Sequence, residues 1–207
     1  MKIIVAGIHT GIGKTICSSI LCEILQADYW KPVQAGDLES SDSIFVSAHT
    51  SNTRIHPERF RLSVPASPHY AAQVDGVEIK LDDFTIPNTN NTLIIETAGG
   101  LMSPLSMQVV NIDLLLHFSL PVVLVSENYL GSINHTLLSI QLLKEKNIDV
   151  VGIVFNGDKN IATEEFINNY SGLPTLFCIP KFTHLNRNTI VEFANENRSS
   201  VIQSLQQ

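Results

Sequence analysis

The chain has 207 residues, 44% of them hydrophobic, a length that suits one α/β domain over residues 1–207 and leaves little room for a second. Its 13 Lys and Arg against 20 Asp and Glu give a formal net charge of −7, which disfavours nucleic acid and anionic membranes as partners. No apolar run reaches the roughly 18–20 residues of a membrane span, and the first residues lack the long apolar stretch of a signal peptide. Cys17, Cys22 and Cys178 have no metal-type spacing, so we expect reduced thiols and a cytoplasmic location.

Apolar runs that alternate with amphipathic segments predict an α/β fold, a mostly parallel sheet with helices on both faces. The expected elements, in chain order, are strand 2–6, helix 15–26, strand 29–33, helix 42–50, strands 92–96 and 121–126, helix 133–146, strands 150–155 and 174–179, and helix 189–206. Ser40 or Ser41 is expected to cap helix 42–50, and Ile44, Phe45 and Ala48 are expected to face inward. Residues 51–91 are polar and interrupted by prolines, and we predict no element there. Such a sheet binds ligands beyond the carboxyl ends of its strands.

A glycine-rich segment links the first expected strand to the first helix. It runs from Gly7 to Thr15 with the sequence GIHTGIGKT. Its glycines let backbone N–H groups turn toward phosphate oxygens, and the helix N-terminus adds partial positive charge. Lys14 is placed to reach the β- and γ-phosphates of ATP, and the Thr15 hydroxyl to bind Mg²⁺. Five residues, rather than the usual four, separate Gly7 from the Gly-Lys-Thr triplet.

Two carboxylates and a second lysine stand near the ends of other expected strands. Glu96 ends an apolar run, where a charge is costly to desolvate unless a cation meets it; the alternative is a solvated edge residue. Asp42 follows Ser41 and, taken alone, is equally typical of a helix start. Lys31 is either a solvated residue or a catalytic cation beside the phosphate loop. Two lysines that converge on a γ-phosphate suit a reaction that builds and breaks an acyl phosphate.

These motifs, with others further along, resemble the dethiobiotin synthetase family of ATP-dependent carboxylases and cyclo-ligases. The resemblance runs from Gly7 to about Phe182. It rests on the phosphate loop, Lys31-Pro32-Val33, Ser41-Asp42, Ser67-Pro68-His69, Glu96-Thr97-Ala98-Gly99-Gly100, Leu130-Gly131-Ser132-Ile133-Asn134-His135, Asn156 and Ile179-Pro180.

The resemblance implies a reaction of diaminopelargonate with carbon dioxide and ATP. One amine forms a carbamate, ATP phosphorylates it, and the second amine closes the ring with loss of phosphate. Lys31 and Lys14 would be catalytic, and Thr15, Asp42 and Glu96 would bind Mg²⁺. The implied nucleotide-binding residues are Gly11, Ile12, Gly13, Lys14, Thr15, Ile16, Asp42, Glu96, Thr97, Ala98, Gly99, Asn156, Gly157, Pro180, Lys181 and Phe182, with Asn156 at the adenine edge.

The resemblance also implies a homodimer, because in this family the segment at Gly131–Asn134 comes from the neighbouring subunit and receives the substrate carboxylate. The implied substrate residues are Thr10, Lys31, Ala35, Gly131, Ser132, Ile133 and Asn134. Two positions depart from the family pattern. Ala35 replaces a small hydroxyl residue, and Thr97 stands where glycine is common, so we expect altered affinity rather than loss of activity.

Two other classes of P-loop protein share this scaffold. Switch ATPases of the septum-placing or partition type carry a signature lysine four residues before the glycine of Gly-Lys-Thr, and that position here is His9. Another small-molecule ligase or kinase is the remaining alternative. Cobyrinate amidation enzymes usually add a glutaminase domain, for which this chain is too short.

Overall fold

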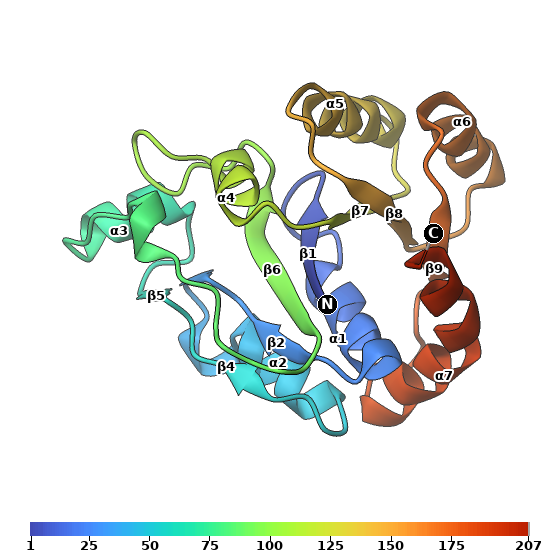
Figure 1. Ribbon diagram of the computed structural model, residues 1–207, viewed down its shortest axis with the longest axis horizontal. Helices are drawn as coiled ribbons and strands as arrows, with labels where there is room; N and C mark the ends of the chain where they lie inside the picture. Colours follow the sequence, from blue (N-terminus) through green and yellow to red (C-terminus); the bar gives the residue numbers. More distant parts are fainter. Residues whose placement is uncertain (207) are drawn as a thin grey trace.

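The computed structural model describes residues 1–206, which form a seven-stranded sheet between two layers of helices (Figure 1). The strands lie in the order β4-β2-β6-β1-β7-β8-β9, and every pairing between neighbours is parallel. Their bounds are β1 Lys2–Gly7, β2 Asp28–Trp30, β4 Ile55–His56, β6 Leu93–Gly100, β7 Val122–Glu127, β8 Val150–Asn156 and β9 Thr175–Ile179. The helices are α1 Lys14–Leu25, α2 Asp42–His49, α3 Pro68–Val74, α4 Asn111–Phe118, α5 Ser132–Glu145, α6 Ile161–Ser171 and α7 Arg187–Ser204. The expected α/β fold class is confirmed.

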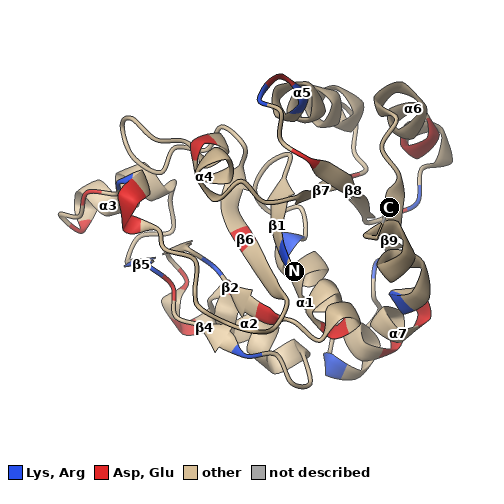
Figure 2. Cartoon of the chain, viewed as in Figure 1, with Lys and Arg blue, Asp and Glu red and all other residues tan. Residues whose placement is uncertain are grey.

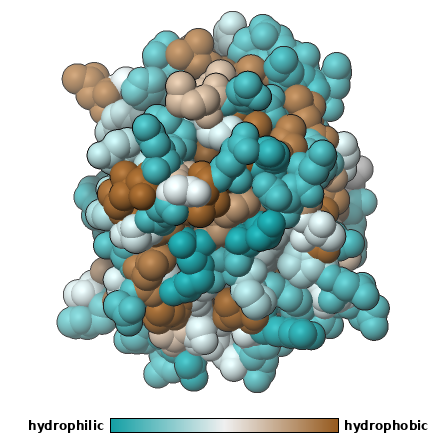
Figure 3. Space-filling model, turned by 90° about the vertical axis from the view of Figure 1, so that its left-hand side faces the viewer, coloured by the Kyte–Doolittle hydropathy of each residue, from teal (hydrophilic) through white to brown (hydrophobic). Residues whose placement is uncertain are grey.

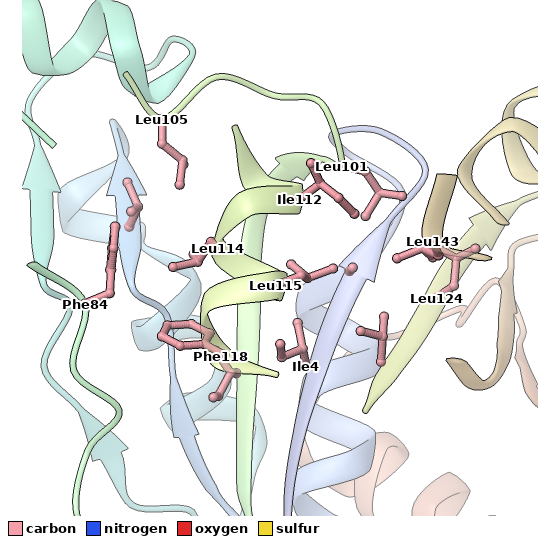
Figure 4. Packing of buried hydrophobic residues seen from close by; sticks show 14 of the residues in the cluster. Ile4, Phe84, Leu101, Leu105, Ile112, Leu114, Leu115, Phe118, Leu124 and Leu143 are labelled. Atoms are coloured by element: carbon pink, nitrogen blue, oxygen red, sulfur yellow. The ribbon is translucent and has the colours of Figure 1, made fainter. Parts of the chain in front are cut away.

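Strand β1 shows why helices cover both faces of the sheet. Side chains alternate along a strand, so Ile4 packs with α4, α5 and α6, whereas Ile3 packs with α1, α2 and α7. In Figure 4, Leu114, Leu115 and Phe118 of α4 point toward the sheet near Ile4. Strands buried on both faces are apolar throughout, as the sequence of a parallel sheet requires.

The strand predicted at 29–33 is wrong as a single element. Strand β2 ends at Trp30, the chain leaves the main sheet at Lys31-Pro32, and a new strand, β3 (Val33–Ala35), follows. Proline cannot donate to a strand ladder, which accounts for the break. Strand β3 pairs in parallel with β5 (Phe60–Leu62) in a small second sheet, so part of the segment left unassigned is ordered structure.

The predicted inward face of helix 42–50 is also wrong. Ile44 and Ala48 are exposed and Phe45 is only partly buried, whereas Val46 is fully buried against α1 and the sheet. Ser41, rather than Ser40, caps the helix by accepting a hydrogen bond from the Ile44 N–H. The helix of eight residues is too short for its apolar spacing to define a face.

Charge and hydropathy are distributed differently over the molecule. Most charged positions lie on helices and loops rather than on the central strands, although β6 and β7 each carry one acidic position (Figure 2). The side that carries α3 presents hydrophobic side chains scattered among hydrophilic ones (Figure 3), and Tyr70 and Val74 of α3 are exposed. Across residues 1–206, no helix is both long and apolar enough to cross a membrane.

Candidate active site

A cavity of about 780 Å³ opens at the carboxyl ends of β1, β2 and β6, where a parallel sheet is expected to bind ligands. Most of the phosphate loop and both predicted lysines line it. The predicted site residues that it brings together are Thr10, Gly11, Gly13, Lys14, Thr15, Ile16, Lys31, Ala35, Asp42, Glu96, Ala98 and Gly99. Ile12 and Thr97 are buried beside it and do not line it. Thr97, Ala98 and Gly99 belong to β6 itself, which continues four residues beyond the predicted end at Glu96.

The loop from Ile8 to Gly13 has the backbone of a phosphate-binding loop. Gly11 and Gly13 have φ values of 75° and 87°, which glycine adopts without steric cost. Lys14 donates to the His9 carbonyl at 2.9 Å across the loop. Burial, together with the nearby charge of Lys31, lowers the pKa of Lys14 to about 8. An arriving polyanion would reverse that effect, so the loop is suited to phosphate.

Three oxygen-bearing side chains meet at the cavity floor. The Thr15 hydroxyl lies 2.7 Å from Oδ1 of Asp42 and 3.0 Å from Oε1 of Glu96, which is 1% exposed. Hydroxyl and carboxylate oxygens are the ligands that Mg²⁺ prefers, so this donor set fits Mg²⁺. No cluster of three His, Cys, Asp or Glu side chains occurs within residues 1–206, so water and phosphate oxygens would have to complete the coordination.

Lys31 lies between the two carboxylates and is buried, so the alternative of a solvated lysine is wrong. Its ammonium donates to Oε1 of Glu96 at 2.9 Å and forms an ion pair with Asp42. Burial alone would lower the pKa of Lys31, but the charges of Glu96 and Asp42 outweigh burial and raise it. Burial would raise the pKa of Asp42, but Lys31 outweighs it and lowers that pKa. Lys31 is therefore held as a cation inside the cavity.

Residues predicted to bind the adenine lie on the other side of the phosphate loop. The Asn156 side chain donates to the Ile12 carbonyl at 3.1 Å, and Gly157 N–H donates to the Ile179 carbonyl at 2.9 Å. Phe182 packs edge-on against Phe193. In the same region, Pro180 and Lys181 are exposed, and Lys181 forms an ion pair with Asp158. None of these predicted residues lines the cavity, and Asn156 contacts the loop through its hydrogen bond to Ile12.

The predicted carboxylate-binding segment, Gly131–Asn134, is at the start of α5. Ser132 is buried, Ile133 is partly buried, and Gly131 and Asn134 are exposed. None of these four residues lines the cavity that contains Lys31. The segment's link to the phosphate loop is indirect, because Tyr129 packs edge-on against His9 at 5.4 Å and the Tyr129 hydroxyl lies 2.6 Å from His135 Nδ1.

Comparison with known proteins identifies the family. Residues 1–189 match a family model described as an AAA domain. The ATP-dependent dethiobiotin synthetase of Rhodopseudomonas palustris (strain BisB18) is 46% identical over 191 residues, which are 91% of each chain. That of Cytophaga hutchinsonii is 46% identical over 196 residues, which are 93% of this chain and 95% of its own. The chain belongs to the dethiobiotin synthetase family.

Solved structures support the fold of this dethiobiotin synthetase family member. The septum site-determining protein MinD of Pyrococcus horikoshii, complexed with Mg-ADP, aligns with a TM-score of 0.55 at 14% identity, over 99% of this chain and 93% of its own. The cell division ATPase MinD of Pyrococcus furiosus aligns with a TM-score of 0.53 at 14% identity, over 96% and 98%. At such low identity the likeness shows a shared fold and nothing of function.

One wall of the cavity contains Ala35, a position expected to depart from the family pattern. Ala35 lies in β3, and Val33, Ala35, Pro65, Ala66 and Pro68 make this wall largely apolar. Three serine residues, Ser40, Ser67 and Ser103, also line the cavity. A hydroxyl that residue 35 does not supply is therefore available from other elements of this dethiobiotin synthetase fold.

Sequence reasoning missed the two residues that hold the Glu96 carboxylate. The Ser18 hydroxyl donates to Oε2 of Glu96 at 2.8 Å, and the Tyr29 hydroxyl donates to the same atom at 2.9 Å. Burial, and then the charge of Glu96, raise the pKa of Tyr29, so its hydroxyl stays protonated. Spacing held a signal for both. Ser18 is three residues after Thr15 on a helix, and Tyr29 is two residues before Lys31 along extended chain, so each shares a side with a predicted residue.

Proposed function

We propose that residues 1–207 form one P-loop domain that converts diaminopelargonate, carbon dioxide and ATP into dethiobiotin, ADP and phosphate. One substrate amine adds to carbon dioxide to give a carbamate. A carbamate oxygen takes the γ-phosphoryl group of ATP, which releases ADP. The second amine then attacks the carbamate carbon, the ureido ring closes, and phosphate leaves. The family membership supports this reaction, and the joint position of Lys14, Lys31 and the phosphate loop in one cavity carries the argument.

Each charged residue has a role that its position supports. Lys14 and the loop N–H groups bind the β- and γ-phosphates, and the backbone keeps them in place before ATP arrives. Lys31 stabilises the negative charge of the carbamate and of the transferring phosphoryl group, because its ammonium is held as a cation beside both. Preorganised cations of this kind lower the barrier without reorganising during the reaction.

Magnesium is part of the proposal. Thr15, Asp42 and Glu96 would hold Mg²⁺, which supplies charge neutralisation at the β- and γ-phosphates when bound. The Thr15 hydroxyl lies within hydrogen-bond distance of both carboxylates at the cavity floor. Asp42 and Glu96 would share their negative charge between this cation and Lys31.

Substrate recognition combines an apolar wall with a segment from a second subunit. The wall formed by Val33, Ala35, Pro65, Ala66 and Pro68 suits a methylene chain. A homodimer would bring the Gly131–Asn134 segment of a partner to the substrate carboxylate. The support is that these residues lie outside the cavity of their own chain, while the N-terminus of α5 offers backbone N–H groups to an anion.

The adenine would lie beside Asn156, with Gly157, Pro180, Lys181 and Phe182 around it. The support is the position of the Asn156 amide against the phosphate loop. We also propose a cytoplasmic location, since Cys17 and Cys22 are free, fully buried thiols.

A product assay tests the proposed reaction. Purified protein is incubated with Mg-ATP, bicarbonate and diaminopelargonate, and dethiobiotin is detected by mass spectrometry with ADP measured in parallel. Product that requires all three substrates, with one ADP for each dethiobiotin, supports the proposal. ATP binding without product would refute the substrate assignment and would favour the alternative of another P-loop ligase.

A further inference from the structure

The carboxylate of Glu96 has two differently occupied oxygens. Oε1 faces the cavity floor, where Thr15 and Lys31 donate to it at 3.0 and 2.9 Å. Oε2 points the other way and accepts from Ser18 at 2.8 Å and from Tyr29 at 2.9 Å. Ser18 and Tyr29 are both 0% exposed, so no solvent competes for this oxygen.

The two donors of Oε2 come from different elements. Ser18 lies on α1, Tyr29 lies on β2, and Glu96 lies on β6. The carboxylate plane is therefore fixed from two directions by parts of the structure that are themselves buried. Rotation of the Glu96 side chain would leave two buried hydroxyls and one buried carboxylate oxygen without partners, which is costly.

The donors are neutral, and this matters for what Oε1 can bind. A cation at Oε2 would compete for the negative charge of the carboxylate. Hydroxyl groups satisfy Oε2 by hydrogen bonding but leave the net charge in place. A cation in the cavity would therefore share the negative charge of Glu96 with Lys31 alone, on an oxygen whose direction is already set.

We propose that Ser18 and Tyr29 are positioning residues that fix the Glu96 carboxylate so that Oε1 alone is presented to a divalent cation. Neither residue lines the cavity, and both act through Glu96. Outer-sphere partners of a metal ligand affect metal affinity by roughly 10- to 100-fold when removed. The inference rests on the proposed function only in assigning a divalent cation to Glu96, and it is independent of which small molecule is carboxylated.

The test measures Mn²⁺ binding without turnover. Tyr29→Phe and Ser18→Ala each remove one hydroxyl, and free Mn²⁺ is titrated by electron paramagnetic resonance in the presence of ADP. We expect the Mn²⁺ dissociation constant to rise roughly 10-fold in each variant. The affinity for ADP in the presence of a chelator should stay within about twofold, because the phosphate loop is untouched.

Ser19→Ala is the matched control. Ser19 is also a fully buried hydroxyl of α1, but it donates to the Thr15 carbonyl at 2.8 Å and does not contact Glu96. This variant should lower the melting temperature as Ser18→Ala does, and it should leave the Mn²⁺ dissociation constant at the wild-type value. A role that is merely structural would change the melting temperature of all three variants and the Mn²⁺ affinity of none.

Two results would overturn the inference. One is a Mn²⁺ dissociation constant in Tyr29→Phe and Ser18→Ala that equals that of Ser19→Ala. The other is the absence of ADP-dependent Mn²⁺ binding in the wild-type protein, which would remove the cation from Glu96 altogether. Neither result depends on dethiobiotin formation, so failure of the product assay remains distinguishable from both.

Discussion

The Lys31 ammonium donates to Oε1 of Glu96 across 2.9 Å, and the two side chains are 5% and 1% exposed. The hydroxyls of Ser18 and Tyr29 donate to the other oxygen of Glu96. Lys31 also pairs with Asp42. The residue proposed to stabilise the carbamate thus shares an oxygen with the residues proposed to bind the cation. Substitution of Lys31 should separate the two functions.

Lys31→Gln should abolish turnover and spare nucleotide binding. Loss of a preorganised charge that stabilises the transition state lowers kcat by roughly 100- to 1,000-fold. Lys14 and the loop amides remain, so the dissociation constant for ATP should change by less than about threefold. Single-turnover kinetics and isothermal titration calorimetry measure the two quantities. Lys80→Gln removes an exposed lysine paired with Glu78 and serves as the control. Turnover by Lys31→Gln near the wild-type rate would contradict the catalytic role.

Gly13→Ala should weaken ATP binding much more than Gly11→Ala. Both glycines have positive φ, so each alanine imposes a backbone strain of about 1–2 kcal/mol. A Cβ at residue 11 meets no atom within 4 Å, whereas a Cβ at residue 13 would lie 2.5 Å from Nδ2 of Asn156. The second variant must therefore displace Asn156. Calorimetry with ATP and with inorganic triphosphate should show that Gly13→Ala loses more affinity for ATP than for triphosphate. Equal ATP affinities of the two variants would argue against a nucleotide role for Asn156.

The residues predicted from sequence and those missed differ in physical character. Lys14 was predictable from the glycine-rich phosphate loop, and Glu96 because a charge at the end of an apolar run needs a partner of opposite charge. Ser18 and Tyr29 were missed, although their spacing from Thr15 and Lys31 held a signal, because a hydroxyl within an apolar segment is common and its partner lies on another element. The position of Lys31 was predicted, but the second sheet that the chain enters beyond Pro32 was not. Strands β3 and β5 have three residues each, too few for a periodic pattern to appear.

Asp28→Asn should destabilise the protein at neutral pH and have less effect in acid. The Asp28 carboxylate is buried and accepts hydrogen bonds from His56 at 2.9 Å, Thr89 at 2.8 Å and Asn91 at 2.9 Å. Burial would raise the pKa of Asp28, but these donors outweigh it and lower the pKa. The stabilisation is therefore complete above the unfolded-state pKa of about 3.9 and is lost as the pH falls through the lower folded-state value.

Denaturant unfolding of wild type and Asp28→Asn at pH 7 and at successively lower pH measures this effect. We expect the unfolding free energies of the two proteins to differ by about 1–3 kcal/mol at pH 7, and this difference to narrow in acid. Asp82→Asn changes an exposed carboxylate and should show neither effect. A difference that is constant with pH would mean that the charge of Asp28 contributes nothing.

Mixing two inactive variants should restore activity if the site is shared between subunits. In a mixed dimer of one Lys31→Gln chain and one Asn134→Ala chain, one site would have both defects and the other would have neither. Random exchange of subunits should then recover about a quarter of wild-type turnover. Each variant alone, and a mixture kept from exchanging, provide the controls. A mixture that stays inactive after exchange is confirmed would place the Asn134 contribution within its own chain.

Because the chain leaves the main sheet at Lys31-Pro32, residues attached to two different sheets line the cavity. The phosphate loop and Glu96 are attached to the seven-stranded sheet, whereas Val33 and Ala35 are attached to the small sheet formed by β3 and β5. If the carbon chain of the substrate lies against Val33 and Ala35 as proposed, changes of shape in the small sheet can alter the accepted chain while the nucleotide-binding residues keep their framework. An engineer who wishes to recruit this enzyme for a longer or shorter diamine should diversify 33–35 and 60–68 together, and should leave the lysine at their junction untouched.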